Sequence, residues 1–364
     1  MEIQIHASVR IRPTYNNTDQ IQWIVDHLET RRRFSLPIVG VMLLLVCIEP
    51  IDEKIAAKKI GSRLSSIPIE VLEQLLENLK SKKLLIMSTD LNNQKERECM
   101  VRFAQQGWER AWDYLLLTYN YPFVNYAADG RAIDAKLMEE YGQSEADISR
   151  FKKYSYPLNR YPLPKIEINL VPVNVRTAYN NIQHKDWGIK ELYNLCAVAF
   201  GRTGIINQNQ FYPTSEPLYM KTSPSMGARH PVEAYVWVRA VNGLNEGFYH
   251  VCVGDHQLDY LSDRKLSSEE LSEWIPEINE VRNEPPRAIL VLTAVFERSM
   301  YRYREPHIFR TIHLDVGHLS ASVELIANSC GMIVANFSIT KVFAAELLDA
   351  EFLNEGAMAA IALW

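Results

Sequence analysis

The apolar positions of the first 90 residues follow helix and strand periods in turn. Ile3–Ile11 alternates apolar and polar residues, as a strand does. Val39–Cys47 is apolar at nearly every position, and Ile51–Ile60 has acidic residues in its first turn, where they suit the positive end of a helix. From Ile69 the apolar residues recur at helical spacing, and a short strand follows at Leu84–Met87. Three helices and then a strand predict a small winged-helix-like N-terminal domain.

One apolar run in this domain resembles a membrane segment at first sight. The run LPIVGVMLLLVCI at Leu36–Ile48 is shorter than the ~20 residues that a membrane-spanning helix needs. It also contains a proline and a glycine, so we expect a buried helix. The first residues, MEIQIHASVRI, alternate like a strand and do not resemble a signal peptide. The sequence therefore predicts no membrane association.

The middle of the chain is helical in pattern and rich in aromatic residues. Residues 151–172 carry four prolines and are expected to form an extended linker. Two interpretations of the aromatic segment stay open, a hydrophobic connector and a wall of a peptide channel. The sequence thus predicts three parts, at residues 1–90, 91–174 and 175–364.

The last part mixes strand and helix patterns. Lys190–Phe200 is an amphipathic helix that stops at Gly201. Asp315–Cys330 is predicted as a long helix with Asp315 as its N-cap. Further strands and one helix are expected at Glu233–Val241, Gly247–Val253, Ala288–Phe296, Met332–Asn336, Lys341–Leu348 (the helix) and Met358–Leu363. This mixture predicts an α+β layered sheet with flanking helices.

Composition narrows the classes of function. The net charge is −5 and the pI about 6.0, which gives no basic surface for nucleic acid. The five cysteines are scattered without a CxxC pair, so neither a zinc site nor a disulfide framework is expected, and a reducing cytoplasm is the simplest compartment. His313 and His318 are not spaced as ligands on one helix face, so we predict no metal site.

Three blocks in the last part carry the chemistry. Thr222–Val238 reads TSPSMGARHPVEAYVWV, a turn of small residues followed by a strand in which the valines and the alanine alternate with Glu, Tyr and Trp on the opposite face. Such a turn exposes backbone N–H groups and can approach a flat polar ligand closely. Gly243–Val251 reads GLNEGFYHV, and Arg302–His318 contains RYREP and LDVGH. In wording, order and spacing the chain from about Val175 resembles the SagB/ThcOx type of nitroreductase-like flavoproteins.

The resemblance implies a nitroreductase-like fold and an FMN-dependent dehydrogenase that modifies ribosomally made peptides, typically by oxidising azolines to azoles. It implies that Arg176 and Thr177 hold the FMN phosphate, although Tyr179 stands where the family has a second arginine. It implies that Asn336 and Phe337 meet the edge of the isoalloxazine ring, while the basic residue that relatives carry after the last strand is absent here.

The resemblance also assigns the turn to the flavin. Ser225, Met226 and Gly227 are the expected contacts, and Met226 replaces a glycine that is common in the family. A positive Arg229 beside the ring would stabilise the reduced flavin. His230 has two open interpretations, a second polar contact and a hydrogen-bonded structural residue.

Arg302 and Tyr303 match the place where azoline-oxidising relatives have a Lys-Tyr pair. An arginine stays charged and cannot act as a base, which leaves Tyr303 as the candidate for proton transfer. We expect the neighbouring guanidinium groups of Arg302 and Arg304 to lower the pKa of the Tyr303 phenol.

Three functions from these residues stay open. The first is FMN-dependent dehydrogenation of a peptide, with the enzyme a homodimer. The second is flavin-dependent reduction of a dehydroamino acid, with Tyr303 as proton donor. The third is a flavin-poor scaffold that binds a peptide and presents it to partner biosynthetic enzymes. For the N-terminal module, leader-peptide recognition by strand addition, a structural or dimer-forming role, and the less favoured DNA binding are the alternatives.

Overall fold

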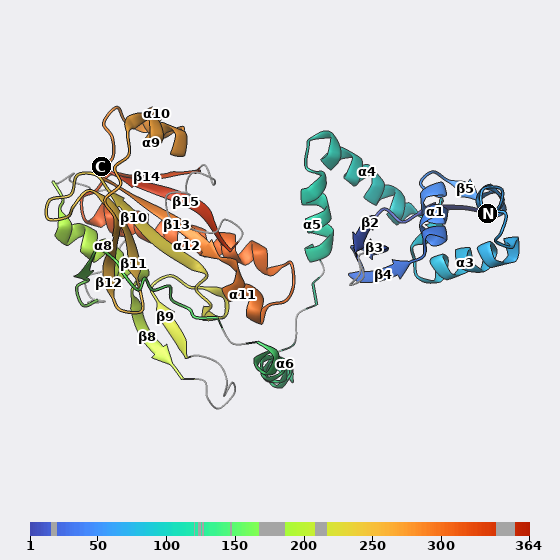
Figure 1. The fold of residues 1–364 in the computed structure, drawn as a ribbon, viewed down its shortest axis with the longest axis horizontal. Helices are drawn as coiled ribbons and strands as arrows, with labels where there is room; N and C mark the ends of the chain where they lie inside the picture. The colour runs from blue at the N-terminus through green and yellow to red at the C-terminus, as the bar shows by residue number, and fades with distance from the viewer. Residues whose placement is uncertain are drawn as a thin grey trace. The chain divides into compact units, whose positions relative to one another are not determined.

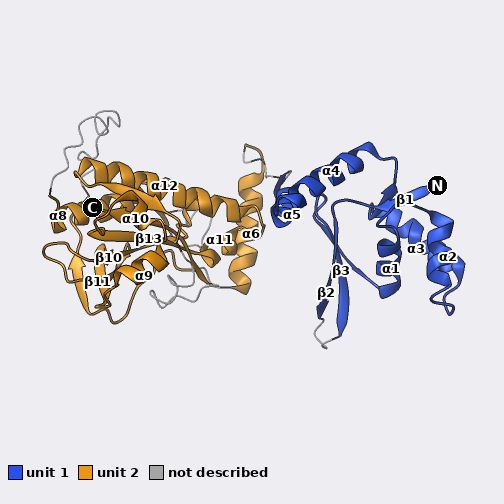
Figure 2. Ribbon diagram, turned by 90° about the horizontal axis from the view of Figure 1, so that it is seen from above, with its two compact units in different colours: residues 1–123 blue, residues 124–364 orange. Residues whose placement is uncertain are grey.

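The computed structural model describes residues 1–15, 20–119, 121–122, 125, 127–145, 148–166, 186–207, 217–339 and 354–364. The chain forms two compact units, Met1–Phe123 and Val124–Trp364 (Figure 2). Each unit contains a hydrophobic core of its own. In the described part of the chain, no helix is long and apolar enough to cross a membrane.

The first unit packs helices onto two small sheets. Its antiparallel sheets have three strands each, in the orders β5-β1-β6 and β2-β3-β4 (Figure 1). Residues from both sheets and from the first three helices share one core. The elements are β1 Glu2–Ile5, β2 Val9–Tyr15, β3 Ile21–His27, β4 Arg32–Leu36, α1 Ile38–Val46, β5 Ile51–Asp52, α2 Glu53–Gly61, α3 Ile69–Ser81, β6 Leu85–Met87, α4 Leu91–Gln105 and α5 Glu109–Tyr119.

Local chemistry explains where these helices lie. α1 takes up most of the apolar run and buries one side of it in the core. α2 starts after Asp52, whose side chain accepts hydrogen bonds from the N–H groups of Lys54 and Ile55 at 3.0 and 3.4 Å. α3 buries Leu72 and Leu76, which lie on one face at helical spacing. The expected order of three helices and a strand is therefore present.

The prediction of a single strand over Ile3–Ile11 is wrong, because this segment contains parts of two strands. β1 ends at Ile5 and β2 begins at Val9, because side chains take up the backbone N–H groups between them. The Ala7 N–H donates to Asn93 Oδ1 at 2.7 Å, and the Ser8 N–H donates to His6 Nδ1 at 3.1 Å. The hairpin of β3 and β4 was not predicted either. The unit has a small sheet as expected, and the winged-helix assignment stays a prediction.

The second unit is built around one large sheet with helices packed against it. Its antiparallel sheet has seven strands in the order β14-β15-β13-β10-β11-β12-β7 (Figure 1). The elements are α6 Gly130–Ser144, β7 Asn159–Pro162, α8 Ile189–Phe200, β8 Arg202–Ile206, β9 Leu218–Lys221, a 3-10 turn Met226–Ala228, β10 Val232–Val238, β11 Gly247–Cys252, β12 Gln257–Ser262, α9 Ser268–Trp274, α10 Ile278–Val281, β13 Ala288–Val295, α11 Phe296–Arg302, α12 Ile308–Ser329, β14 Val334–Phe337 and β15 Glu355–Leu363.

The sheet of this unit is covered on both faces. Val236 and Val238 of β10 pack with α8 and α12, whereas Tyr235 and Trp237 pack with α9 and α10. The alternation predicted for this strand is confirmed, and burial on both faces explains why the strand carries so few polar residues. The mixed α+β class is likewise confirmed.

Three expectations for the second unit need correction or fall outside the description. Asp315 is not an N-cap, because α12 begins at Ile308, after the cap residue His307. The stretch predicted as a linker contains β7, which pairs with β12 as an edge strand of the sheet. The helix expected near Lys341–Leu348 lies outside the described residues. Of the expected connector, α4 and α5 belong to the first unit, and α6 and β7 to the second.

Candidate functional site

The turn between β9 and β10 has an unusual backbone. Gly227 has a φ of 58°, and Ala228 and His230 have φ values of 49° and 48°, in the left-handed region that residues other than glycine rarely adopt. Ala228 N–H and Arg229 N–H donate within the turn, to the carbonyls of Ser225 and Met226 at 3.0 and 3.2 Å. Strained backbone of this kind gathers at functional sites and persists only where contacts around it fix it.

One set of those contacts comes from α12. Ser225 Oγ donates to Asp315 Oδ2 at 2.6 Å, and the hydroxyls of Ser223 and Ser322 lie 2.6 Å apart. Burial raises the pKa of Asp315, and the hydrogen bond from Ser225 opposes this shift. The turn and the LDVGH segment, distant in sequence, are thus joined by a buried carboxyl group.

A second contact joins the turn to Tyr303. A Cβ atom placed on Gly227 would overlap the hydroxyl oxygen of Tyr303. The phenol therefore lies directly against the backbone of the turn, and the absence of a side chain at Gly227 allows it. Met226, the residue before Gly227, is 43% exposed. The structure brings together Tyr303 and the predicted turn residues.

Arg302 and Arg304 make ion pairs of their own. Arg302 pairs with Asp134 of α6, and its guanidinium lies 5.4 Å from the centre of the Tyr303 ring. Arg304 pairs with Glu145 at 3.2 Å. The charge that was expected to act on the Tyr303 phenol is thus offset by two carboxylates, and Arg302 holds Tyr303 by packing.

Arg229 and His230 are directed into the protein. Arg229 is 1% exposed, its Nε donates to the carbonyl of Arg298 at 2.5 Å, and its guanidinium lies 5.4 Å from the centre of the Tyr301 ring. The ring of His230 donates to the carbonyl of Tyr219 at 2.6 Å, and burial lowers the pKa of His230 to about 3. His230 is therefore a neutral, hydrogen-bonded residue that fixes the turn to β9.

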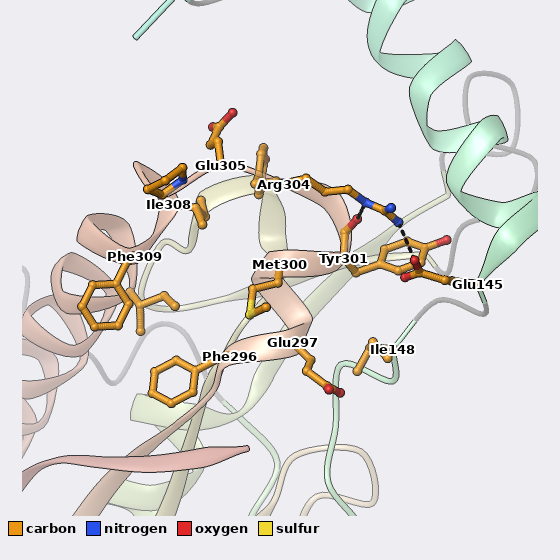
Figure 3. Close-up of a pocket in the computed structure, with 13 residues that line it drawn as sticks. Glu145, Ile148, Phe296, Glu297, Met300, Tyr301, Arg304, Glu305, Ile308 and Phe309 are labelled. Atoms are coloured by element: carbon orange, nitrogen blue, oxygen red, sulfur yellow. Dashed lines mark hydrogen bonds and ion pairs between the residues drawn. The ribbon is translucent and has the colours of Figure 1, made fainter. Parts of the chain in front are cut away.

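A cavity of about 760 Å³ opens beside Tyr303 (Figure 3). Met300 and Phe309 line it and are 55% and 46% exposed, so apolar surface faces its interior. Arg304 and Glu145 form an ion pair at its edge. The lining is apolar over most of its area and also carries the charged side chains of Glu145, Glu297, Arg304 and Glu305. A volume of this size with largely apolar walls is typical of small-molecule and cofactor sites.

The other predicted cofactor residues are not at this place. Asn336 is exposed on β14, and its amide donates to Glu324 at 3.3 Å. Phe337 is buried in the core on the other face of the sheet, with its ring centre 6.5 Å from that of Trp364. Arg176 and Thr177 lie outside the described residues.

Sequence reasoning missed Lys221, the last residue of β9. With Ser225, His230 and Asp315 it lines a small cavity behind the turn. Burial lowers the pKa of Lys221 to about 8. A lone basic residue directly before the small-residue turn was the signal that could have found it. Unlike Arg302, this side chain can change its protonation state near neutral pH.

Sequence reasoning also missed a buried charge network under the turn. Glu233 of β10 accepts from Arg298 at 2.5 Å, from His250 Nε2 at 2.9 Å and from the Lys152 N–H at 3.0 Å. Burial alone favours the neutral acid, but Arg298 and His250 lower the pKa of Glu233 to about 2. Glu233 is the one charged residue in the otherwise apolar segment VEAYVWV, and a buried carboxylate needs a positively charged or hydrogen-bonding partner, so the sequence did carry a signal for this network. The network fixes α11, and with it Tyr303, to the start of β10.

These residues fit a flat aromatic cofactor in part. The cavity beside Tyr303 has the size and the largely apolar walls that such a ring requires, whereas the turn contacts Tyr303 through Gly227 and does not itself line the cavity. The hydroxyl of Ser225 and the side chain of Arg229 already have protein partners.

Comparison with known proteins identifies the family. The trifolitoxin-processing protein TfxB of Rhizobium leguminosarum bv. trifolii is 32% identical over 267 residues, which cover 69% of this chain and 69% of TfxB. A candidate nitroreductase of Methanocaldococcus jannaschii is 29% identical over 141 residues, 39% of this chain and 65% of that protein. No family model matches the chain.

Among solved structures, the E. coli microcin synthetase McbBCD complex with truncated pro-MccB17 bound is similar with a TM-score of 0.39 and 14% identity, covering 68% of this chain and 96% of that chain. The similarity to TfxB extends over more than two thirds of both sequences and agrees with the motifs described above. The chain therefore belongs to the nitroreductase-like family of the SagB type that includes TfxB.

Proposed function

We propose that this protein is an FMN-dependent oxidoreductase that modifies a ribosomally synthesised peptide, by dehydrogenating an azoline ring to an azole or by a comparable dehydrogenation. The observation that carries the proposal is the similarity to a toxin-processing protein, TfxB, over most of the chain. The contact between Gly227 and the Tyr303 hydroxyl supports it, because two of the family's motifs meet there and Tyr303 also lines the cavity.

The nitroreductase-like family typically binds flavin. In the proposed site Ser225, Met226 and Gly227 supply the turn, and Arg176 and Thr177 bind the phosphate. Asn336, Phe337 and Arg229 were assigned to the ring from the resemblance. Their present contacts mean that they reach the ring only after rearrangement or from a second subunit, and we propose a homodimer as the assembly.

When bound, FMN supplies the acceptor for the hydride that leaves the substrate carbon. The chain's own task is to take up the proton that is lost with it. Tyr303 is the catalytic candidate, since its hydroxyl lies at the turn and its ring lines the cavity. Arg302 positions Tyr303 through the ion pair with Asp134. Lys221, with a pKa near 8, is a second group able to exchange a proton behind the turn.

The first unit is proposed to recognise the leader segment of the peptide. In the described residues, each of its two three-stranded sheets has two edge strands that pair on one side only. In the second sheet these edge strands are β2 and β4. An extended peptide can add a strand to such an edge through backbone hydrogen bonds. The α1 helix beside the sheet carries exposed apolar side chains, Ile38 and Leu45, each 50% exposed, that could contact the apolar residues of a leader.

Two measurements on the purified full chain test the proposal. A visible spectrum after incubation with FMN should show the bands of bound flavin. Incubation with FMN, an oxidant and a candidate azoline peptide should lower the peptide mass by a pair of hydrogens. A gain of hydrogens with NAD(P)H would instead support reduction of a dehydroamino acid. No flavin bands and no mass change would reject both redox functions.

One alternative is favoured by particular contacts. Arg229 is engaged by Arg298 and Tyr301, and Asn336 by Glu324, so several predicted flavin contacts are used within the protein itself. A flavin-poor scaffold that binds a peptide and presents it to partner enzymes accounts for this. It predicts saturable peptide binding in calorimetry without flavin uptake or turnover.

A further inference from the structure

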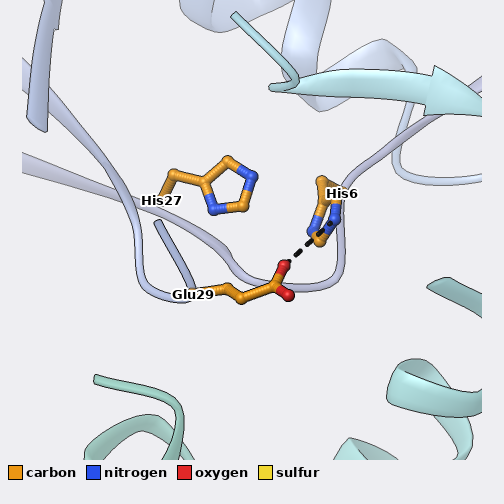
Figure 4. Close-up of side chains that lie close together, drawn as sticks. All are labelled: His6, His27 and Glu29. Atoms are coloured by element: carbon orange, nitrogen blue, oxygen red, sulfur yellow. Dashed lines mark ion pairs between the residues drawn. The ribbon is translucent and has the colours of Figure 1, made fainter. Parts of the chain in front are cut away.

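Three side chains of the first unit converge at a place unrelated to the site described above (Figure 4). His6 directly follows β1, His27 is the last residue of β3, and Glu29 lies in the turn after it. One possible ligand atom from each of the three lies within 4.8 Å of the other two. The two imidazole rings are 4.5 Å apart with a tilt of 44°, and His6 Nε2 lies 3.8 Å from a carboxylate oxygen of Glu29.

His27 is the most unusual member of this group. The side chain is 1% exposed, and within the described part of the chain neither ring nitrogen makes a hydrogen bond of good geometry, although the backbone of Lys83 lies close enough to act on the ring. Buried polar atoms are almost always paired, so an unpaired imidazole in a core indicates a missing partner. Burial lowers the pKa of His27 to about 4, and the neutral ring keeps a lone pair available at neutral pH.

The charged residues around His6 favour a bound cation, whereas the charge near His27 does not. Glu29, Asp90 and Glu96 act on His6, against a single opposing Arg97. Lys83 acts on His27 and opposes a cation there. Burial lowers the pKa of His6, and the three carboxylates oppose that shift. Two imidazoles beside a carboxylate, with one ligand atom from each within 4.8 Å of the others, form a donor set of the kind that zinc sites use.

We propose that His6, His27 and Glu29 bind a divalent transition-metal ion, with Zn²⁺ as the best match to two imidazoles and one carboxylate. The remaining coordination position would belong to water or to a substrate group. The ion would join β1 of one small sheet to β3 of the other, across the break that separates β1 from β2. Its effect would be to stabilise the first unit as a single body.

Metal binding changes one existing hydrogen bond. The Ser8 N–H donates to Nδ1 of His6, so the proton of the neutral His6 ring is on Nε2. Binding through Nε2 requires the other neutral tautomer of His6, in which the proton is carried on Nδ1, so the hydrogen bond from the Ser8 N–H is lost. The neutral ring loses no net proton in this exchange, and binding is expected to weaken in acid, where a proton competes with the ion for the imidazole nitrogens.

The test uses the full chain after treatment with a chelator. Titration with ZnCl₂ in a calorimeter should show one ion bound per chain, and Zn²⁺ should raise the midpoint of thermal unfolding whereas Mg²⁺ should not. Co²⁺ should give the visible absorption bands of a low-symmetry site with nitrogen ligands. These readouts do not depend on FMN or on turnover.

Two variants decide the assignment. Glu29→Gln and His6→Asn should each weaken Zn²⁺ binding by at least about tenfold. The exposed His313→Asn in α12 is the matched control and should bind Zn²⁺ as the unchanged chain does. Circular dichroism must show that each variant is folded, and Glu29, with its side chain 55% exposed, is the safer of the two.

Loss of binding in both variants and not in the control supports the site. Absence of Zn²⁺ binding, or unchanged affinity and unchanged Co²⁺ bands in Glu29→Gln and His6→Asn, would overturn it. In that case His6 and Glu29 form an ordinary surface contact over a buried His27.

Discussion

The turn before β10 and the strand β14 were both assigned to the flavin, yet the structure treats them differently. In the turn, Gly227 lies against the Tyr303 hydroxyl and Ser225 is bonded to Asp315. In β14, Phe337 packs into the core and Asn336 is bonded to Glu324 at the surface. The turn has a special backbone that only particular residues permit, whereas β14 is fixed by ladder pairing with β15, which accepts many residues. A motif whose residues are required by an unusual backbone conformation is therefore a better guide to residues that contact one another than a motif that forms an ordinary strand.

The largest expected effect comes from Tyr303→Phe. This change removes the phenol and keeps the ring, so the fold should persist while turnover falls by about 10²–10⁴-fold, the usual contribution of a proton-transfer group. The rate of peptide dehydrogenation checks it. Tyr156→Phe, at a side chain that is 96% exposed, is the control and should turn over normally. Equal rates for both variants would remove Tyr303 from the proposed chemistry.

The next effect comes from Gly227→Ala. An alanine at a φ of 58° costs about 1–2 kcal/mol, and the overlap with the Tyr303 hydroxyl adds about 1–3 kcal/mol of overpacking. Urea unfolding measures the sum. Gly317→Ala in α12 is the matched control, because a Cβ there meets no atom within 4 Å, and it should gain about 0.5–1 kcal/mol. A stable Gly227→Ala protein would show that the turn is not held as described.

A smaller and pH-dependent effect is expected from Ser225→Ala. The change leaves the Asp315 carboxylate buried with one donor fewer, at a cost of about 1–3 kcal/mol at neutral pH. The pKa of Asp315 is raised in the folded state, so its favourable contribution is present below its ordinary pKa and is lost as the pH rises through the folded value. The deficit of the variant should therefore be larger at pH 7 than near pH 3, which lies below the ordinary pKa of an aspartate, so that the carboxyl group is protonated.

Unfolding of Ser225→Ala at both pH values checks the sign. Ser329→Ala removes a hydroxyl that donates to the carbonyl of Ile326 at 2.7 Å and contacts the Cys330 thiol, whose pKa is raised by burial. Because that thiol stays protonated at both pH values, the variant should show a small deficit that is the same at both. A deficit of Ser225→Ala that grows toward acid would contradict the assignment.

The smallest effect is expected from Asn336→Ala. Its amide makes a long, exposed hydrogen bond to Glu324, so the stability should change by less than about 0.5 kcal/mol. Flavin binding, followed by absorbance titration, should also be unchanged if β14 is only a sheet strand. A weaker affinity for FMN in this variant would restore Asn336 to the cofactor site and would end the contrast with the turn.

The amino-acid pattern was sufficient for elements that depend on local periodicity. The helices α1, α2, α3 and α8 and the alternation of β10 follow from apolar spacing and from capping residues such as Asp52. The family was likewise predicted from the sequence motifs at the turn and around Tyr303, and the comparison with TfxB confirmed that prediction. The start of α12 was placed at Asp315 because the cap preference of an acidic residue was weighed above the helical pattern before it.

Contacts between distant residues could not be predicted in this way. His6, His27 and Glu29 come together because two strands of different sheets end at the same place, and no spacing along the chain shows it. The hydrogen bond from Ser225 to Asp315, the approach of Tyr303 to Gly227 and the pairing of β7 with β12 are of the same kind. Local sequence determines the periodicity and the backbone freedom of each segment, because these depend on neighbouring residues. Which side chains share a buried carboxyl group or a bare patch of backbone depends on how the segments pack, and only the tertiary structure decides that.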